Sequence, residues 1–152
     1  MKIRKYKPTD AKETMQLFYD TVHLVNCRDY NEKQLDVWAP KNRDENVWNA
    51  SFLPHYSLVV VENTTIIGFG DIDESGYLDR FYIHASYQNQ GVGKFLLKAL
   101  EDYVSKDKTI TTHASITAKP FFEKMGYVMV KEQTVVRSGV ELTNYVMEKR
   151  YR

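Results

Sequence analysis

The residues best suited to bind an anion form one glycine-containing loop, Gln88-Asn89-Gln90-Gly91-Val92-Gly93-Lys94. Residues 76–84, before it, are rich in Tyr, Leu, Phe and Ile, which predicts a buried strand. Residues 95–104, after it, carry apolar side chains at helical spacing. Because glycine lets the backbone approach a ligand and a helix N-terminus offers unpaired N–H groups, this loop is suited to a pyrophosphate. A tight turn that binds nothing is the alternative.

Two other phosphate-binding loops do not match this spacing. A dinucleotide-binding loop has the form GxGxxG and follows the first strand, and an acidic residue stands about 20 residues later. Here the two glycines follow three or four predicted strands. A GxxxxGK loop requires Ser or Thr after its lysine, whereas Phe95 follows Lys94.

The loop instead resembles the acetyl-coenzyme A loop of the GCN5-related N-acetyltransferases (GNAT), Gln/Arg-x-x-Gly-x-Gly/Ala. Gln88, Gly91 and Gly93 match this pattern. Residues 83–87 resemble the family's Val-x-Pro-x-Tyr lead-in, with Ala85 in place of proline.

Two further segments carry the same resemblance. Residues 118–127 are similar to a later helix of the family that ends in Tyr-Glu-Lys-x-Gly-Phe. Residues 35–40, followed by Trp48, resemble the substrate-side segment of one bacterial branch. The resemblance therefore runs from about residue 3 to residue 149.

The resemblance implies an α/β fold of the α+β type, in one domain over residues 1–152. It implies a mixed, mostly antiparallel sheet of about six to seven strands flanked by about four helices. The sheet is expected to splay at the strand before the loop, where the pantetheine arm of acetyl-CoA, the implied cosubstrate, would lie. The implied acetyl-CoA-binding residues are Phe81, Tyr82, Ile83, Gln88, Asn89, Gln90, Gly91, Val92, Gly93, Lys94 and Ser115.

Two of these residues have a more specific expected role. The N–H of Ile83 is the candidate donor to the thioester carbonyl and its oxyanion. Ser115 falls where many relatives have an Asn that touches the cofactor arm, and capping of the next helix is its alternative role.

Direct attack on a thioester requires a free amine, and an alkylammonium has a pKa of about 10.4, so a general base is useful. Relatives often place a Glu on the strand before the loop, and Tyr77 stands at that position. Asp79 is two residues on and shares the face of Tyr77 in a regular strand, which makes it the candidate catalytic base. Asp71, Asp73 and His113 are its rivals.

The thiolate that leaves also has to be considered. Many relatives protonate it with a tyrosine on the later helix, but Phe122 stands there and has no proton to give. Either Tyr127 or Tyr145 supplies the proton, or the thiolate leaves unassisted.

The acceptor amine is expected to bind between the first two helices and the strand tips, because that half carries no cofactor motif. Trp38 and Trp48 are the candidate substrate-binding walls, and ordinary core packing is their alternative role. The four histidines show no metal-ligand spacing and there is no Cys cluster, so no metal is expected.

The elements that must position these residues follow the order β-α-α-β-β-β-α-β-α-β-β. The strands are expected at residues 2–6, 56–62, 65–71, 76–84, 109–114, 127–136 and 140–149. The helices are expected at residues 11–25, 31–38, 95–104 and 117–125, with a turn or short helix at 43–50.

Composition excludes several classes of protein. The net charge is +1 and the basic residues are scattered, so neither nucleic acid nor a membrane surface is an expected partner. Cys27 is the single cysteine, which fits a reducing cytoplasm, and residues 1–7 do not resemble a signal peptide. Cytoplasmic location is therefore expected, and a homodimer through the last hairpin is an open alternative.

Together these features predict an acetyl-CoA-dependent N-acetyltransferase. The acetyl group would move to a primary amine of a small molecule or peptide by direct attack. The alternative is an acyl-CoA-binding or sensing module with little catalytic activity, an interpretation that Phe122 favours.

Overall fold

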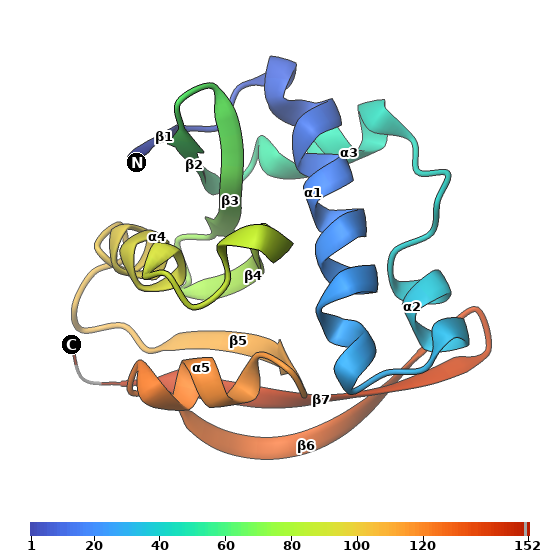
Figure 1. Cartoon of the computed structure of the whole chain (residues 1–152). Coiled ribbons are helices and arrows are strands. Elements are labelled where there is room, and N and C mark those ends of the chain that lie inside the picture. Colours follow the sequence, from blue (N-terminus) through green and yellow to red (C-terminus); the bar gives the residue numbers. More distant parts are fainter. Residues whose placement is uncertain (151) are drawn as a thin grey trace.

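The computed structural model describes residues 1–150 and 152. Its centre is a sheet with the strand order β1-β2-β3-β4-β5-β7-β6 (Figure 1). The strands are β1 (Lys2–Lys5), β2 (Tyr56–Glu62), β3 (Thr65–Ile72), β4 (Tyr77–Ile83), β5 (Ile110–Ser115), β6 (Val128–Arg137) and β7 (Val140–Lys149). The helices are α1 (Ala11–Leu24), α2 (Glu32–Trp38), α3 (Glu45–Phe52), α4 (Val92–Glu101) and α5 (Lys119–Lys124), with 3-10 turns at Pro8–Asp10, Asn26–Arg28 and Ala85–Tyr87.

The expected element order is confirmed over the described residues, and the sheet is mixed and mostly antiparallel. The segment expected to be a turn or short helix at 43–50 is helix α3, which begins at Glu45 and ends at Phe52. Asp44 caps α3, because its carboxylate accepts hydrogen bonds from the N–H groups of Asn46 and Val47.

Strands β4 and β5 form the parallel pair of the sheet, and they part soon after they meet. Their register pairs are Tyr77 with Thr111 and Leu78 with Thr112. Beyond Leu78, β4 continues beside β3 while β5 continues beside β7. The sheet is thus splayed at the strand before the glycine loop, as expected.

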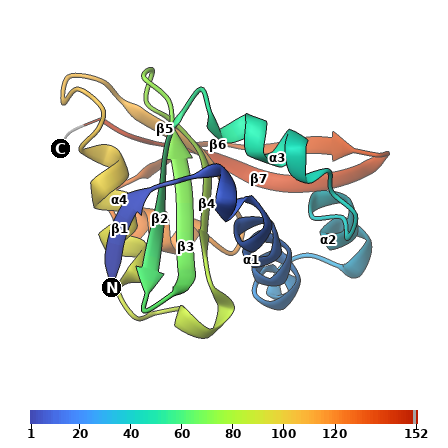
Figure 2. The same ribbon diagram turned by 90° about the horizontal axis from the view of Figure 1, so that it is seen from above.

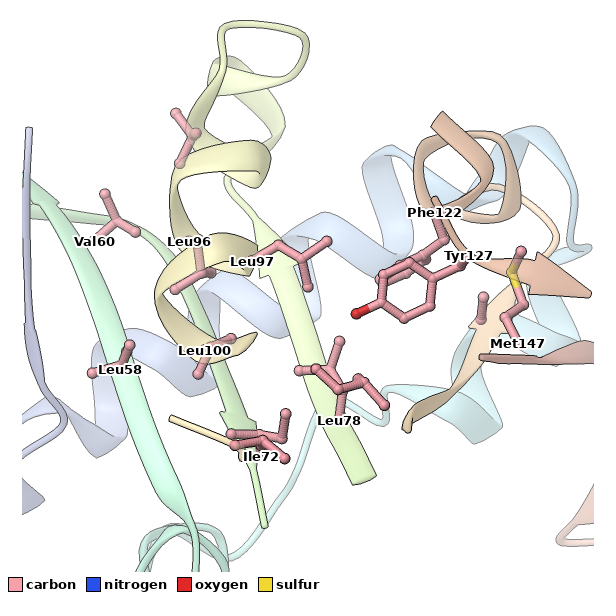
Figure 3. Packing of buried hydrophobic residues seen from close by; sticks show 14 of the residues in the cluster. Leu58, Val60, Ile72, Leu78, Leu96, Leu97, Leu100, Phe122, Tyr127 and Met147 are labelled. Carbon is pink, nitrogen blue, oxygen red and sulfur yellow. The ribbon is translucent and has the colours of Figure 1, made fainter. Parts of the chain in front are cut away.

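Helices cover both faces of the sheet (Figures 1 and 2). On one face, α4 packs on β2 and β3, and its Leu96, Leu97 and Leu100 enter a buried cluster with Leu78 and Phe122 (Figure 3). On the other face, α1, α2 and α3 enclose a second buried cluster. Within the described residues, none of these helices has the length and apolar character needed to cross a membrane.

Strand β6 is an edge of the sheet and carries exposed apolar side chains. Val128 is 68 % exposed, Val130 52 % and Val136 64 %. Exposed apolar edge strands favour pairing with another chain. A homodimer through the β6–β7 hairpin stays a prediction.

Two glycines of β3 allow a test of the packing of α4 on the sheet. A Cβ at Gly70 would lie 2.8 Å from a methyl of Leu100 and 2.9 Å from the backbone oxygen of Arg80. We expect Gly70→Ala to lower the free energy of unfolding by about 1–3 kcal/mol, because it overpacks this contact. Urea denaturation measures the change.

Gly68→Ala is the matched control in the same strand. Its Cβ would meet the movable end of the Ile83 side chain at 3.0 Å, which can shift. The loss should therefore be smaller, and equal losses in the two variants would contradict the packing argument.

Candidate functional site

A cavity of about 360 Å³ opens on the α1–α3 side of the molecule. Its walls come from both strands that part, with Tyr77 and Asp79 from β4 and His113 and Ser115 from β5. The cavity therefore lies at the point where the splay begins. We refer to it as the acceptor pocket.

A β-bulge in β4 determines which side chains enter this pocket. Ile72 of β3 pairs with Leu78, whereas the preceding residue Asp71 pairs with Arg80, so Asp79 is an extra residue in β4. Side chains alternate between faces in a regular strand, and one inserted residue shifts that alternation. As a result, Tyr77, Asp79, Arg80 and Tyr82 all line the acceptor pocket.

The bulge is held by the buried carboxylate of Asp71, which is 0 % exposed. Its Oδ1 accepts hydrogen bonds from the backbone N–H of Arg80 at 3.0 Å and from Nε of Arg80 at 3.1 Å. Its Oδ2 accepts from Nη2 of Arg80 and from Nδ1 of His55, both at 2.7 Å. Because the carboxylate is fully bonded, the burial of its charge is compensated.

The position of Arg80 is determined further by aromatic and hydroxyl contacts. Its guanidinium lies 3.7 Å from the ring centre of Phe52 and 5.0 Å from that of Trp48. Its Nη1 donates to Oγ of Ser51 at 2.7 Å. The backbone beside Asp79 is therefore rigidly held.

Asp79 itself is exposed to solvent at the mouth of the acceptor pocket. Partial desolvation in the concave wall raises the pKa of its carboxyl, and the negative charges of Asp71 and Asp73 raise it further. The positive charges of Arg80 and His55 oppose this shift. A carboxylate with a raised pKa is a stronger proton acceptor, which suits a general base.

The rivals of Asp79 have other contacts. Asp71 is the buried ion-pair partner of Arg80. Asp73 stabilises a turn, because its carboxylate accepts hydrogen bonds from the N–H groups of Ser75 and Tyr77. Desolvation alone would raise the pKa of Asp73, but its hydrogen bonds to Ser75 and Tyr77 together outweigh that effect, and the pKa is lowered. His113 lines the pocket, and its ring packs edge-on against Tyr77 at 5.3 Å.

The two tryptophans predicted to contact the substrate lie in one pocket, and their contact with a substrate stays a prediction. Trp38 and Trp48 both line the acceptor pocket, together with Phe18 and Tyr82. Trp48 is also buried, and its Nε1 donates to Oγ1 of Thr14 at 3.0 Å. The tryptophan thus has a packing role whether or not it touches a substrate.

The glycine loop ends at the N-terminus of α4, on the other side of the splay. Gly91 is the N-cap, with a φ of 82°, no side-chain cap, and open space where a Cβ would lie. The first N–H groups of α4 have no partner within the helix. These features fit a pyrophosphate.

The other loop residues contribute differently. A Cβ at Gly93 would lie 2.9 Å from the ring of Phe121, so Gly93 allows α4 to pack against α5. Nε2 of Gln88 donates to the backbone oxygen of Ile83 at 2.7 Å and ties the loop to the end of β4. Lys94 is exposed on the first turn of α4.

The register of β4 shows which backbone groups face the gap. The N–H of His84 donates to the oxygen of Ile67 in β3. Antiparallel strands alternate, so Tyr82 also bonds to β3, whereas the N–H groups of Phe81 and Ile83 point away from β3 toward the gap. Of the three residues expected to offer main-chain contacts, Tyr82 instead lines the acceptor pocket with its side chain.

Ser115 and Phe122 have structural contacts. Oγ of Ser115 accepts hydrogen bonds from the N–H of Ala118 at 3.0 Å and from Nδ2 of Asn26 at 3.2 Å, so it closes the turn before α5. The N-cap of α5 is Ala118, and the helix has no side-chain cap. The ring of Phe122 is buried and packs on Tyr127 at 5.2 Å. The hydroxyl of Tyr127 donates to Glu101 at 2.7 Å, and burial raises its pKa, so Tyr127 does not face the gap as a free acid.

His55, Asp71 and Asp79 form a cluster that sequence spacing did not reveal. One potential ligand atom from each lies within 4.8 Å of the others. Both oxygens of Asp71 already accept hydrogen bonds from a guanidinium that lies in the same cluster, which disfavours a cation there. The absence of a metal stays a prediction.

Arg43, Arg137 and Asn144 are among the polar residues of the acceptor pocket that sequence reasoning missed. They come from the segment before α3 and from the β6–β7 hairpin. Nothing in their spacing indicated a common site. The length of the hairpin, which reaches across to α2, is the feature that could have suggested it.

Comparison with known proteins places this geometry in a family. The family model of the acetyltransferase (GNAT) domain matches residues 26–149. The uncharacterized N-acetyltransferase YafP of Escherichia coli K12 is 33 % identical over 147 residues, which cover 97 % of this chain and 94 % of that protein.

Solved structures show the same fold. A GCN5-related N-acetyltransferase from Rhodopseudomonas palustris, also named a class-II aminotransferase, superimposes with a TM-score of 0.92 at 30 % identity, over 98 % of this chain and 94 % of that one. The PaiA N-acetyltransferase of Thermoplasma acidophilum, solved with coenzyme A, has a TM-score of 0.76 at 21 % identity, over 99 % and 98 % of the two chains. The chain therefore belongs to the GNAT family of acetyltransferases and is an acyltransferase.

Proposed function

We propose that this enzyme transfers the acetyl group of acetyl-CoA to a primary amine of a small molecule or peptide by direct attack. The observation that carries the proposal is the placement of the acceptor pocket, whose walls come from both β4 and β5 where they part. An amine in the pocket would meet a thioester in the gap. The complexes of PaiA with coenzyme A and of the Salmonella typhimurium acetyltransferase YncA with acetyl-CoA support the donor.

The donor would lie along the splay. The first N–H groups of α4, beside Gly91, would bind the pyrophosphate, with Lys94 as a nearby positive charge. Phe81 and Ile83 would pair with the pantetheine arm through their backbone. The N–H of Ile83 would donate to the thioester oxygen and stabilise the charge that develops on it.

Asp79 would accept the proton of the ammonium, directly or through a water molecule, and so supply the free amine that attacks. The Arg80 guanidinium pairs with Asp71 rather than with Asp79, so it does not occupy the carboxylate that would accept this proton. On the other side, Phe122 offers no hydroxyl to the departing thiolate and Tyr127 is bonded to Glu101. Tyr145, on β7 opposite Ala114, is the remaining tyrosine of the expected pair.

The pyrophosphate site is tested by Gly91→Glu. This substitution places a negative charge where the pyrophosphate binds, and such like-charge contacts cost several kcal/mol. We expect the affinity for acetyl-CoA to fall by about 100-fold or more, measured by calorimetry. Gly139→Glu is the matched control, because Gly139 has a similar φ of 76° and equally open surroundings in the β6–β7 turn. Equal affinities for the two variants would refute the site.

Asp79→Asn tests the base. Asparagine cannot accept the proton, so kcat should fall by about 100-fold. In the wild-type enzyme the rate should decline as pH falls through the raised pKa of Asp79, and this acid limb should be absent in the variant. Asp73→Asn, which alters a turn carboxylate, should retain the limb. A wild-type pH profile in Asp79→Asn would show that another group is the base.

The raised pKa of Asp79 also has a consequence for stability. An unfolded aspartate has a pKa of about 3.9. Because folding raises that pKa, the ionised side chain is unfavourable in the folded state above both values, and protonation removes the penalty as pH falls. Asp79→Asn should therefore have a higher urea midpoint than wild type at pH 7, and the difference should vanish below about pH 4. A difference of the opposite sign would mean that the pKa is not raised.

A further inference from the structure

The acceptor pocket has an unbalanced charge. The charged side chains among its lining residues are Arg43, Arg80, Arg137 and Asp79. Arg80 is neutralised by Asp71, through two side-chain hydrogen bonds. The guanidinium groups of Arg43 and Arg137 therefore exceed the single remaining carboxylate of the wall, that of Asp79, and among the described residues neither forms an ion pair with it.

Arg43 is held in place before any ligand binds. Its Nη2 donates to the backbone oxygen of Trp38 at 3.2 Å. Its guanidinium lies 5.1 Å from the ring centre of Phe18 and 5.5 Å from that of Trp48. It is half-buried, and throughout the described part of the chain no carboxylate lies within 4.0 Å of it.

Arg137 adds a second positive charge to the same region. It is the last residue of β6, its side chain is exposed, and it too has no ion-pair partner among residues 1–150 and 152. Burial lowers the pKa of Arg43, Tyr82 opposes this shift, and the charges of Arg137 and Arg80 add to it. Two like charges that share a concave, partly desolvated wall repel each other, and an anion between them would relieve the repulsion.

Hydrogen-bond acceptors make up another part of the pocket. The carboxylate of Asp79 is one of them. Oδ1 of Asn144 is a second acceptor: it is buried and receives no hydrogen bond from the described residues. A buried acceptor without a donor is costly, so a ligand N–H at this position would be stabilised.

We infer that the acceptor is an amine that carries its own anionic group, a carboxylate or a phosphate. The anion binds to Arg43 and Arg137, while the amino group lies toward Asp79. A planar guanidinium suits both oxyanions, since its donors match their oxygens in pairs. The aromatic walls, formed by Phe18, Trp38 and Trp48, favour a ligand with an apolar body between these groups. The inference rests on the proposed function, because it assigns the acceptor of that same reaction.

The test uses two matched pairs of amines that differ by the anionic group. Phenylalanine is compared with 2-phenylethylamine for a carboxylate, and O-phosphoethanolamine with ethanolamine for a phosphate. The kcat/KM of CoA release is measured for each, and the higher value is expected for the anion-bearing member of at least one pair. The pair that shows the preference identifies the anion.

Variants of the two arginines locate the preference in the structure. In Arg137→Ala and in Arg43→Gln, the ratio of kcat/KM within the preferred pair should fall by about 10- to 100-fold, the range for a lost hydrogen bond to a charged group. The same two amines are used with the wild type and with each variant, so a difference in their basicity affects every ratio of kcat/KM equally and cancels when the ratios are compared. Arg150→Ala is the control, because it removes an arginine that pairs with Glu148 outside the pocket. Arg137 is exposed, so its replacement keeps the test valid if Arg43→Gln does not fold.

The outcomes separate the inference from the function on which it rests. If amines are acetylated but neither pair shows a preference, or both arginine variants keep it, the inference is wrong and the proposed function stands. If no amine is acetylated, calorimetry with the same four compounds decides. Tighter binding of an anion-bearing member, lost in Arg137→Ala, upholds the anion site while the proposed transfer fails; equal binding, or none, overturns the anion site as well.

Discussion

The organisation of the site depends on the buried carboxylate of Asp71. This single side chain accepts three hydrogen bonds from Arg80, one of them from the backbone, and a fourth from His55. A buried charge is tolerated only when it is bonded in this way, and removing one partner of such a pair typically costs about 3–5 kcal/mol. The energy that keeps Asp71 buried therefore also maintains the bulge in β4, and the bulge places Asp79 at the pocket mouth.

The splay of β4 from β5 brings two binding regions of different chemistry together. On the α4 side, backbone N–H groups and an open glycine N-cap suit a pyrophosphate. On the α1–α3 side, aromatic rings and charged side chains surround a pocket. Neither region needs the other for its own packing, since each face of the sheet has its own buried cluster. The reacting atoms would meet where the strands part.

Local patterns determine much of this fold, and for that reason the sequence predicts it well. The order of elements, the loop around Gly91 and the family follow from periodicity, glycine spacing and motif. Asp79 was expected to share a face with Tyr77, and both do line the pocket. The bulge could not be predicted, because it depends on hydrogen bonds between Asp71 and Arg80 that form only when β3 and β4 pair. Arg43 and Arg137 were missed for the same reason: they are 94 residues apart and meet only through the tertiary fold.

The bulge has a consequence for how such a site can arise or be lost. Replacing side chains changes what a strand presents, but the face on which each residue lies depends on the number of residues between two paired positions. Asp79 is the one residue between Leu78 and Arg80, so its deletion would remove the candidate base. It would also restore regular alternation and turn either Tyr77 or the pair Arg80 and Tyr82 away from the pocket. Among descendants of this chain, the site would therefore depend on the length of β4 as well as on the side chains that line the pocket.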